Sequence, residues 1–165
     1  MAKMTVSGLD EFEAKLSKLE QGGVKGAAKM AIYDGAGELA DAVRSSIESI
    51  PSISDKEAMK RYWKKQLSQI THTQKQGLVN GLGIATMRES GGTIETHIGF
   101  DGYNEVHTKR WPNGQPNSMI ARSVESGTSF MQKTPFVRTA VNRAKSSALS
   151  KMQETFEKRI DEIGG

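Results

Sequence analysis

The end of the chain carries the pattern that most constrains its fold, because apolar residues recur there every three or four positions. Thr134 is suited to cap a helix whose first residue is Pro135, where a missing backbone N–H costs nothing. The pattern predicts a helix of about 28 residues, or roughly 42 Å at 1.5 Å per residue. Its apolar stripe comprises Val137, Val141, Ala144, Ala148, Met152, Phe156, Ile160 and Ile163.

This helix is longer than the core of a small domain needs, so its stripe requires a partner along much of its length. One possible partner is another chain. The candidate contacts between subunits are then Val141, Met152, Phe156 and Ile160. The other possible partner is a second helix of the same chain, predicted from about Val24 to Ile50 and stopped by Pro51. Its predicted inner face comprises Ala28, Ala31, Ile32, Leu39, Val43, Ile47 and Ile50.

Three glycines lie inside this second predicted helix, at Gly26, Gly35 and Gly37. Each costs roughly 1 kcal/mol relative to alanine in a helix interior. Their presence indicates either that another backbone packs closely or that the helix is kinked or interrupted.

Shorter elements are predicted elsewhere. A strand over residues 4–7 precedes a helix with one apolar face, formed by Leu9, Phe12, Leu16 and Leu19. Ser54 and Glu57 have the spacing of a helix N-terminal capping box, which predicts a helix that carries Ala58 to Ile70. Residues 71–81 are polar and punctuated by glycine, which predicts a loop.

A hairpin follows, with strands over residues 82–88 and 93–100 joined by the turn Glu89–Gly92. In the second strand Ile94, Ile98 and Phe100 fall on one face, whereas Glu95 and His97 fall on the other. Residues 101–118 predict a long loop, which in a small domain is usually functional or disordered. Residues 119–126 predict a short helix or strand.

Length and composition indicate one domain spanning 1–165, in which residues 52–75 form a helical insert and 101–118 a long loop. The absence of cysteine excludes disulfides and thiolate metal sites, and it fits a reducing cytosol. The apolar runs are too short for a membrane span, and the N-terminus lacks a secretory signal. We therefore expect no membrane partner. The predicted fold class is α+β, with a small antiparallel β-sheet packed against two long helices, one of them the long C-terminal helix.

The net charge of +4 is a mild excess of basic residues on a well-mixed surface, and composition alone does not establish a basic patch. Two basic-aromatic clusters are the candidates for nucleic-acid contact. In the run from Lys60 to Lys65, Trp63 either stacks on a nucleic-acid base or anchors the helix to the core, and we favour the core anchor. The second cluster surrounds Trp111 in the long loop and is open to both interpretations. The candidate DNA-facing basic residues are Arg61, Lys64, Lys65, Lys109 and Arg110.

No spacing typical of a catalytic or metal site is present, so we expect neither an enzyme nor a cofactor. A metal site would require the fold to pair His97 with Glu95, or His107 with Asp101; His72 has no such neighbour. The glycine-rich run 77–83 lacks the lysine and hydroxyl of a phosphate-binding loop, and it precedes a strand where such loops follow one.

Several motifs occur in a recognisable order. Val6-Ser7-Gly8-Leu9-Asp10-Glu11-Phe12 combines a strand with a helix start, and the alanine-rich helix that follows ends at Pro51. Near the end, Val124-Glu125-Ser126-Gly127-Thr128 precedes Thr134-Pro135-Phe136-Val137 and a long helix. In order and spacing these motifs resemble the phage tail-component family named for the tenth gene product of phage HK-ninety-seven. The resemblance covers roughly residues 4–51 and 76–160, and the helix-like insert before Gln76 departs from it.

The resemblance implies a structural virion protein of a tailed phage or prophage, forming a ring at the head–tail junction or upper tail. Its role would be neck assembly, tail completion and head–tail joining, in the virion and, during assembly, in the host cytoplasm. Expected partners are further copies of the chain, connector or head-completion proteins, tail-terminator or tail-tube proteins, and, without sequence specificity, DNA in the channel. Ring closure would use heterologous contacts, with hairpin 82–100 adding a strand across subunits. Trp111 is a further candidate partner contact. The alternative is a small basic nucleic-acid-binding protein.

Overall fold

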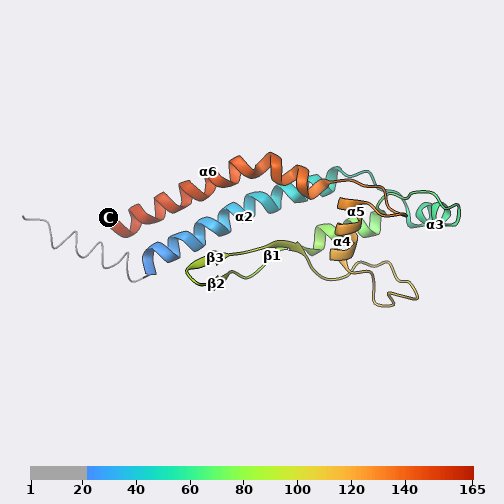
Figure 1. Cartoon of the computed structure of the whole chain (residues 1–165), viewed down its shortest axis with the longest axis horizontal. Coiled ribbons are helices and arrows are strands. Elements are labelled where there is room, and N and C mark those ends of the chain that lie inside the picture. The colour runs from blue at the N-terminus through green and yellow to red at the C-terminus, as the bar shows by residue number, and fades with distance from the viewer. Residues whose placement is uncertain (1–21) are drawn as a thin grey trace, which may run out of the picture.

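The computed structural model describes residues 22–165, and these form an α+β fold dominated by two long helices. Helix α2 (Val24–Ser49) and helix α6 (Phe136–Gly164) run antiparallel and lie side by side over most of their length (Figure 1). Both helices were predicted from their apolar periodicity. The strand and helix predicted over residues 4–19 lie outside the described residues.

The apolar stripe of α6 packs along α2 within the same chain, which is one of the two partners that its periodicity allowed. Gly35 lies in this interface, where an added Cβ would stand 2.7 Å from Met152 Sδ and 3.3 Å from the carbonyl oxygen of Ala148. Helix α2 is continuous through all three glycines. Close packing therefore explains Gly35, whereas Gly26 and Gly37 face open space.

The hydrophobic core lies at the end of the helix pair where α2 ends and α6 begins. There α2 and α6 meet helix α4 (His72–Gly81) and helix α5 (Asn117–Ser126). The most deeply buried side chains are Ile47, Ile70, Leu78, Val43 and Val124. No helix in residues 22–165 has both the length and the apolar composition that a membrane span requires.

Two predicted elements between α2 and the sheet are wrong in extent or type. Helix α3 (Asp55–Trp63) begins as predicted, with Ser54 accepting from the backbone N–H of Glu57, but it ends at Trp63 and not at Ile70. Residues 72–81 form helix α4 and not a loop. A capping box starts α4, in which the N–H of Gln74 donates to Thr71 Oγ1 and the N–H of Thr71 donates to Gln74 Oε1.

The predicted hairpin is present but is divided into two short ladders. Strand β1 (Leu82–Ile84) pairs with β4 (Ile98–Phe100), and β2 (Arg88–Ser90) pairs with β3 (Thr93–Glu95), both antiparallel. Between the ladders three residues, 85–87, oppose two, 96 and 97, which is a bulge. The bulge explains why one continuous pair of strands does not form. The turn at Gly91 and Gly92 has positive φ at both residues, as a two-residue hairpin loop requires.

The hairpin lies against α2 through side chains near the turn. Glu89 forms ion pairs with Lys25 and Lys29 on the first turns of α2. The hydrogen bond from Lys25 lowers the pKa of the Glu89 carboxyl below its ordinary value, with smaller effects in the same direction from the charges of Lys25 and Lys29. In the hairpin, Ile94, Ile98 and Phe100 are half-buried while Glu95 and His97 are exposed, as the alternation predicted.

The start of α6 differs from the prediction in its cap. Thr134 does not cap the helix; its backbone N–H instead donates to the carbonyl of Val124 at 2.7 Å. The cap comes from Glu125 at the end of α5, whose two carboxylate oxygens accept from the N–H groups of Val137, at 2.8 Å, and Arg138, at 3.0 Å. A carboxylate at a helix N-terminus is favoured by the helix dipole as well as by these hydrogen bonds.

Candidate functional site

Titratable side chains do not converge on a single point in the described residues, where no group of three or more histidines, aspartates and glutamates could hold a metal ion. His97 Nε2 lies 3.9 Å from Glu95 on the exposed face of the hairpin. His107 does not pair with Asp101: its Nδ1 hydrogen-bonds the carbonyl of Pro112, at 2.8 Å, and its Nε2 faces a glutamate, Glu105. His72 Nδ1 lies 2.7 Å from Ser52 Oγ, a contact that joins the start of α4 to the segment after α2.

A buried polar layer fixes the loop before α5, so the long loop is folded. Asn104 and Asn117 are both almost fully buried. Asn117 Nδ2 donates to the carbonyl of Asp101 at 2.8 Å, and Asn104 Oδ1 accepts from the N–H of Val106 at 2.9 Å. The amide of Gln74 on α4 donates to the loop as well, by a 2.8 Å bond to Gln115 Oε1. Sequence analysis missed these residues because the partners of Asn117 and Gln74 are distant in the chain.

Two glycines of the run 77–83 allow α4 to pack closely against this polar layer. A Cβ on Gly77 would lie 2.5 Å from Asn104 Cβ and 2.6 Å from Asn117 Oδ1. A Cβ on Gly81 would lie 2.6 Å from Asn117 Nδ2. Close packing of a helix on two buried amides therefore requires glycine at both positions, and no phosphate-binding loop is formed.

The motif at residues 124–128 positions α6. Val124 is in the core, and Glu125 caps α6. Gly127 has φ 75°, and a Cβ there would meet Lys133 Cβ at 2.8 Å. Thr128 Oγ1 accepts from the N–H groups of two residues in the following turn, at 3.2 Å and 2.9 Å. Each residue of the motif except Ser126 thus has a defined part in the chain reversal from α5 to α6.

The candidate subunit contacts on α6 are largely occupied within the chain. Val141 packs on the hydrophobic core, and Met152 covers Gly35 of α2. Phe156 and Ile160, farther along the same stripe, are half-buried. Large apolar side chains remain exposed elsewhere on the pair, at Val24, Met30, Tyr33 and Leu149.

The two basic-aromatic clusters have different structures. In the loop, Trp111 is half-buried and the guanidinium group of Arg110 lies 5.6 Å from the centre of its indole ring, so one ring face is covered from within. Lys109 is exposed beside it. No hydrogen bond or ion pair among residues 22–165 joins this cluster to the one on α3.

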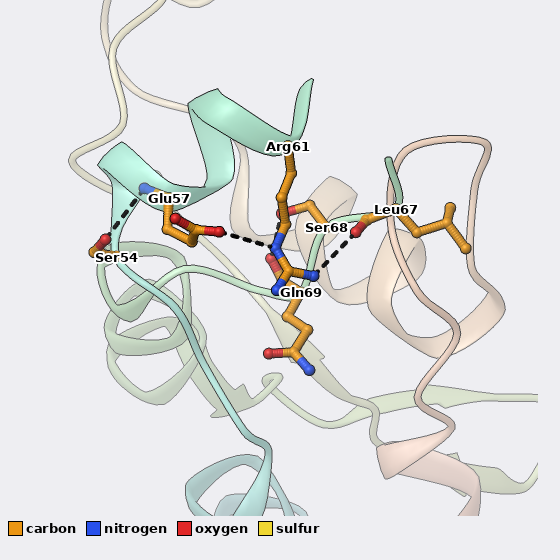
Figure 2. Close-up of polar contacts among 6 residues, drawn as sticks. All are labelled: Ser54, Glu57, Arg61, Leu67, Ser68 and Gln69. Carbon is orange, nitrogen blue, oxygen red and sulfur yellow. Dashed lines mark hydrogen bonds and ion pairs between the residues drawn. The ribbon is translucent and has the colours of Figure 1, made fainter. Parts of the chain in front are cut away.

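On α3 the favoured interpretation of Trp63 is wrong. Trp63 does not anchor the helix to the core, because 75% of its surface is exposed. Arg61 is used within the chain: its Nε faces Glu57 at 3.5 Å and its Nη1 lies 3.4 Å from the carbonyl oxygen of Leu67 (Figure 2). Lys64 and Lys65 are exposed. Lys65 lies beyond the end of the helix, so the three basic residues do not share one helical face.

Comparisons of the chain with protein-family models, with curated proteins and with solved structures found no match. The resemblance described from the motifs therefore stays a prediction.

Proposed function

We propose that the chain is a structural subunit of a tailed phage or prophage virion. It assembles as a ring at the head–tail junction or upper tail, and it acts in neck assembly, tail completion and head–tail joining. Its partners are further copies of itself, connector or head-completion proteins, and tail-terminator or tail-tube proteins. The motif resemblance supports this assignment, and so does the structural use of residues 124–128.

The observation that carries the assembly part of the proposal is a second set of apolar side chains on the α2–α6 pair. The apolar stripe of α6 already packs against α2, yet Tyr33 on α2 and Leu149 on α6 remain 56% and 55% exposed. Scattered exposed apolar residues are ordinary, but here they lie on both helices of an elongated arm (Figure 1). Such an arm offers a long surface to a neighbouring subunit.

The hairpin offers a second surface. Each of its ladders has only two strands within the described residues, so each strand has one edge whose backbone groups lack a neighbouring strand. An open strand edge is a template for pairing with another chain. Heterologous contact through an edge and an arm produces rings when the rotation closes.

The proposal is tested by mass photometry and negative-stain microscopy of the purified chain over a range of concentrations. Rings of uniform size are expected. Replacing Tyr33 by lysine places a charge on the exposed apolar surface of α2. It should raise the concentration needed for half-assembly by about fivefold or more, as loss of an interface tyrosine typically does.

The matched control is Ser45→Lys, which adds the same charge at an exposed position of α2. It should assemble as the wild type does. In a phage or prophage that carries the gene, its deletion should leave heads and tails unjoined. A chain that stays monomeric at all concentrations and is dispensable for infectious particles would overturn the proposal.

A further inference from the structure

Exposed apolar side chains gather where α3 meets the turn 128–131. Five of the large apolar residues that are exposed in the described chain lie here. They come from α3, from the segment directly after it, and from the turn: Met59, Tyr62, Trp63, Leu67 and Phe130. Figure 1 places α3 at the opposite end of the elongated molecule from the C-terminus. A cluster of exposed apolar side chains of this kind indicates a binding site.

Three of these residues are aromatic and touch one another; we call Tyr62, Trp63 and Phe130 the aromatic tip. The ring centre of Tyr62 lies 5.7 Å from that of Trp63 and 5.8 Å from that of Phe130. With Lys65 and Ser129 the three rings line a hollow of about 370 Å³. The hollow thus combines aromatic faces, one ammonium group and one hydroxyl.

Hydrogen bonds hold both walls of the hollow in place without a ligand. The N–H of Ser68 donates to the carbonyl of Phe130 at 2.7 Å, and the N–H of Gln132 donates to the carbonyl of Ser68 at 2.8 Å. The contacts of Arg61 with Glu57 and Leu67 join α3 to the same strand-like segment (Figure 2). A site preformed in this way loses little conformational entropy on binding.

Lys65 occupies a backbone position where lysine is unfavourable. Its φ is +55°, and it is the only residue other than glycine with positive φ among the described residues. The N–H of Lys65 donates to the carbonyl of Tyr62 and the N–H of Gln66 to that of Arg61, which is the Schellman arrangement that usually ends in glycine. Lysine is thus held in a strained conformation at the rim of the hollow, which is typical of a functional position.

Positive charge around the hollow is not neutralised nearby. Lys60 on α3, Lys64 directly after it and Lys133 beyond the turn are exposed, and no ion pair among residues 22–165 involves them or Lys65. The carboxylates of α3 have other partners: Asp55 accepts from Thr73 Oγ1 at 2.6 Å, and Glu57 faces Arg61. The site therefore favours an anionic ligand that also has an apolar, planar part.

From this geometry we infer that the hollow at the aromatic tip binds single-stranded nucleic acid, with a base against the rings of Tyr62, Trp63 and Phe130 and backbone phosphates on Lys64 and Lys65. Stacking on aromatic side chains beside lysines is how single strands are bound without sequence preference. An anionic membrane is the less suitable ligand, because the rings line a hollow. The inference does not depend on ring assembly.

Fluorescence anisotropy of the full chain with labelled oligodeoxythymidine of about twelve nucleotides tests it. Wild-type binding should weaken by roughly tenfold between about 50 and 200 mM salt, as expected for a few phosphate contacts. Trp63→Ala should weaken binding by at least about fivefold. Trp111→Ala, the same change in the loop cluster, should leave it unaltered.

Lys65→Gly separates binding from folding. Glycine relieves the positive-φ strain, so the melting temperature should rise by about 2 °C while binding weakens and its dependence on salt becomes shallower. Lys145→Ala, which removes an exposed charge on α6, controls for net charge. Unchanged affinity in either Trp63→Ala or Lys65→Gly would overturn the inference.

Two further probes decide the class of ligand. Poly-L-glutamate should compete poorly with the oligonucleotide at equal charge, because it carries no bases. Equal competition would show that the site recognises negative charge alone, and it would overturn the inference. Vesicles of phosphatidylcholine with phosphatidylserine should not bind. If they bind in a Trp63-dependent manner and the oligonucleotide does not, the tip is a membrane-binding surface and the inference fails.

Discussion

Gly77 packs a helix directly onto two buried amides, and this contact determines how the long loop is held. The side chains of Asn104 and Asn117 have no room to retreat, because both are at least 96% buried and each is bonded to backbone of the loop region. One atom of each amide, Asn104 Nδ2 and Asn117 Oδ1, has no hydrogen-bond partner among the described residues. A buried polar layer that is incompletely satisfied tolerates little displacement.

Gly77→Ala should therefore destabilise the protein by about 1–3 kcal/mol, as overpacking of a closely packed interior does. Urea denaturation followed by circular dichroism measures the change. Gly37→Ala is the matched control, because Gly37 lies inside α2 with nothing within 4 Å of its added Cβ. That substitution should stabilise the protein by up to about 1 kcal/mol through helix propensity. Equal effects of the two substitutions would show that the amide layer does not constrain Gly77.

Glu125 caps α6 from the end of another helix, so one side chain connects two elements. Glu125→Ala leaves the N–H groups of Val137 and Arg138 without this acceptor and should cost about 1–2 kcal/mol. The free energy of unfolding in urea is the measurement. Ser126→Ala, at the exposed neighbouring position, should change stability by less than about 0.5 kcal/mol. A loss in Glu125→Ala no larger than this would mean that water replaces the cap.

Between elements, the contact of α2 with α6 depends on small residues on one side and a flexible one on the other. Alanines make up most of the buried face of α2, with Gly35 among them. Met152 lies across Gly35, where its unbranched side chain fills the space that a Cβ would take. The two positions should therefore be energetically coupled.

A double-mutant cycle at these positions tests the coupling. In the wild-type background Gly35→Ala forces Met152 to move and should destabilise by about 1 kcal/mol or more. In a Met152→Ala background the remaining close neighbour is the carbonyl oxygen of Ala148, 3.3 Å from the added Cβ, so the same substitution should change stability by less than about 0.5 kcal/mol. Thermal or urea unfolding of the four proteins gives the coupling energy, which should exceed about 0.5 kcal/mol. Additive effects would show that Met152 adapts without cost.

The elements that sequence predicted correctly are those whose signal repeats along the chain. Periodicity over many turns gave α2 and α6, and a Gly91–Gly92 turn between alternating strands gave the hairpin. Helix α4 was missed because its glycines outweighed a capping box, Thr71 with Gln74, that was legible in the sequence. The bulge in the hairpin has no comparable local signal.

The candidate site was predicted less well, because its features depend on distant residues. The residues of the α3 cluster were singled out, yet the exposure of Trp63 could not be told from a core anchor by spacing alone. Phe130 joins the aromatic tip from a turn far along the chain. The positive φ of Lys65 follows from where α3 ends, which was predicted seven residues too late, at Ile70.

In the molecule as a whole, burial along α6 decreases away from the core, whereas α2 keeps Ala27 and Ala31 buried at its far end. The buried residues of α6 are Phe136, Ala140 and Ala148, all in its first half. At the far end the described contacts between the helices include a hydrogen bond from Thr155 Oγ1 to Asp34, at 2.7 Å. Stability against local opening should follow this gradient.

Hydrogen exchange measured by mass spectrometry should show the gradient directly. Peptides from residues 150–164 of α6 should exchange at least about tenfold faster than peptides from residues 137–148, after correction for intrinsic rates. The Met152→Ala variant should speed exchange in the far half and leave the core half unchanged. Uniform protection along α6 would contradict the expectation.

The long helix pair joins the hydrophobic core at one end and contacts the hairpin at the other through the surface ion pairs of Glu89, so the pair can act as a lever. A helix of 29 residues is about 43 Å long, so a tilt of roughly 5° at the core end displaces the far end by about 4 Å. Small rearrangements of side chains around Phe136 would thereby become large movements at the outer end. In the ring proposed above, this lever would let a subunit keep one core and still fit neighbours arranged on circles of different radius.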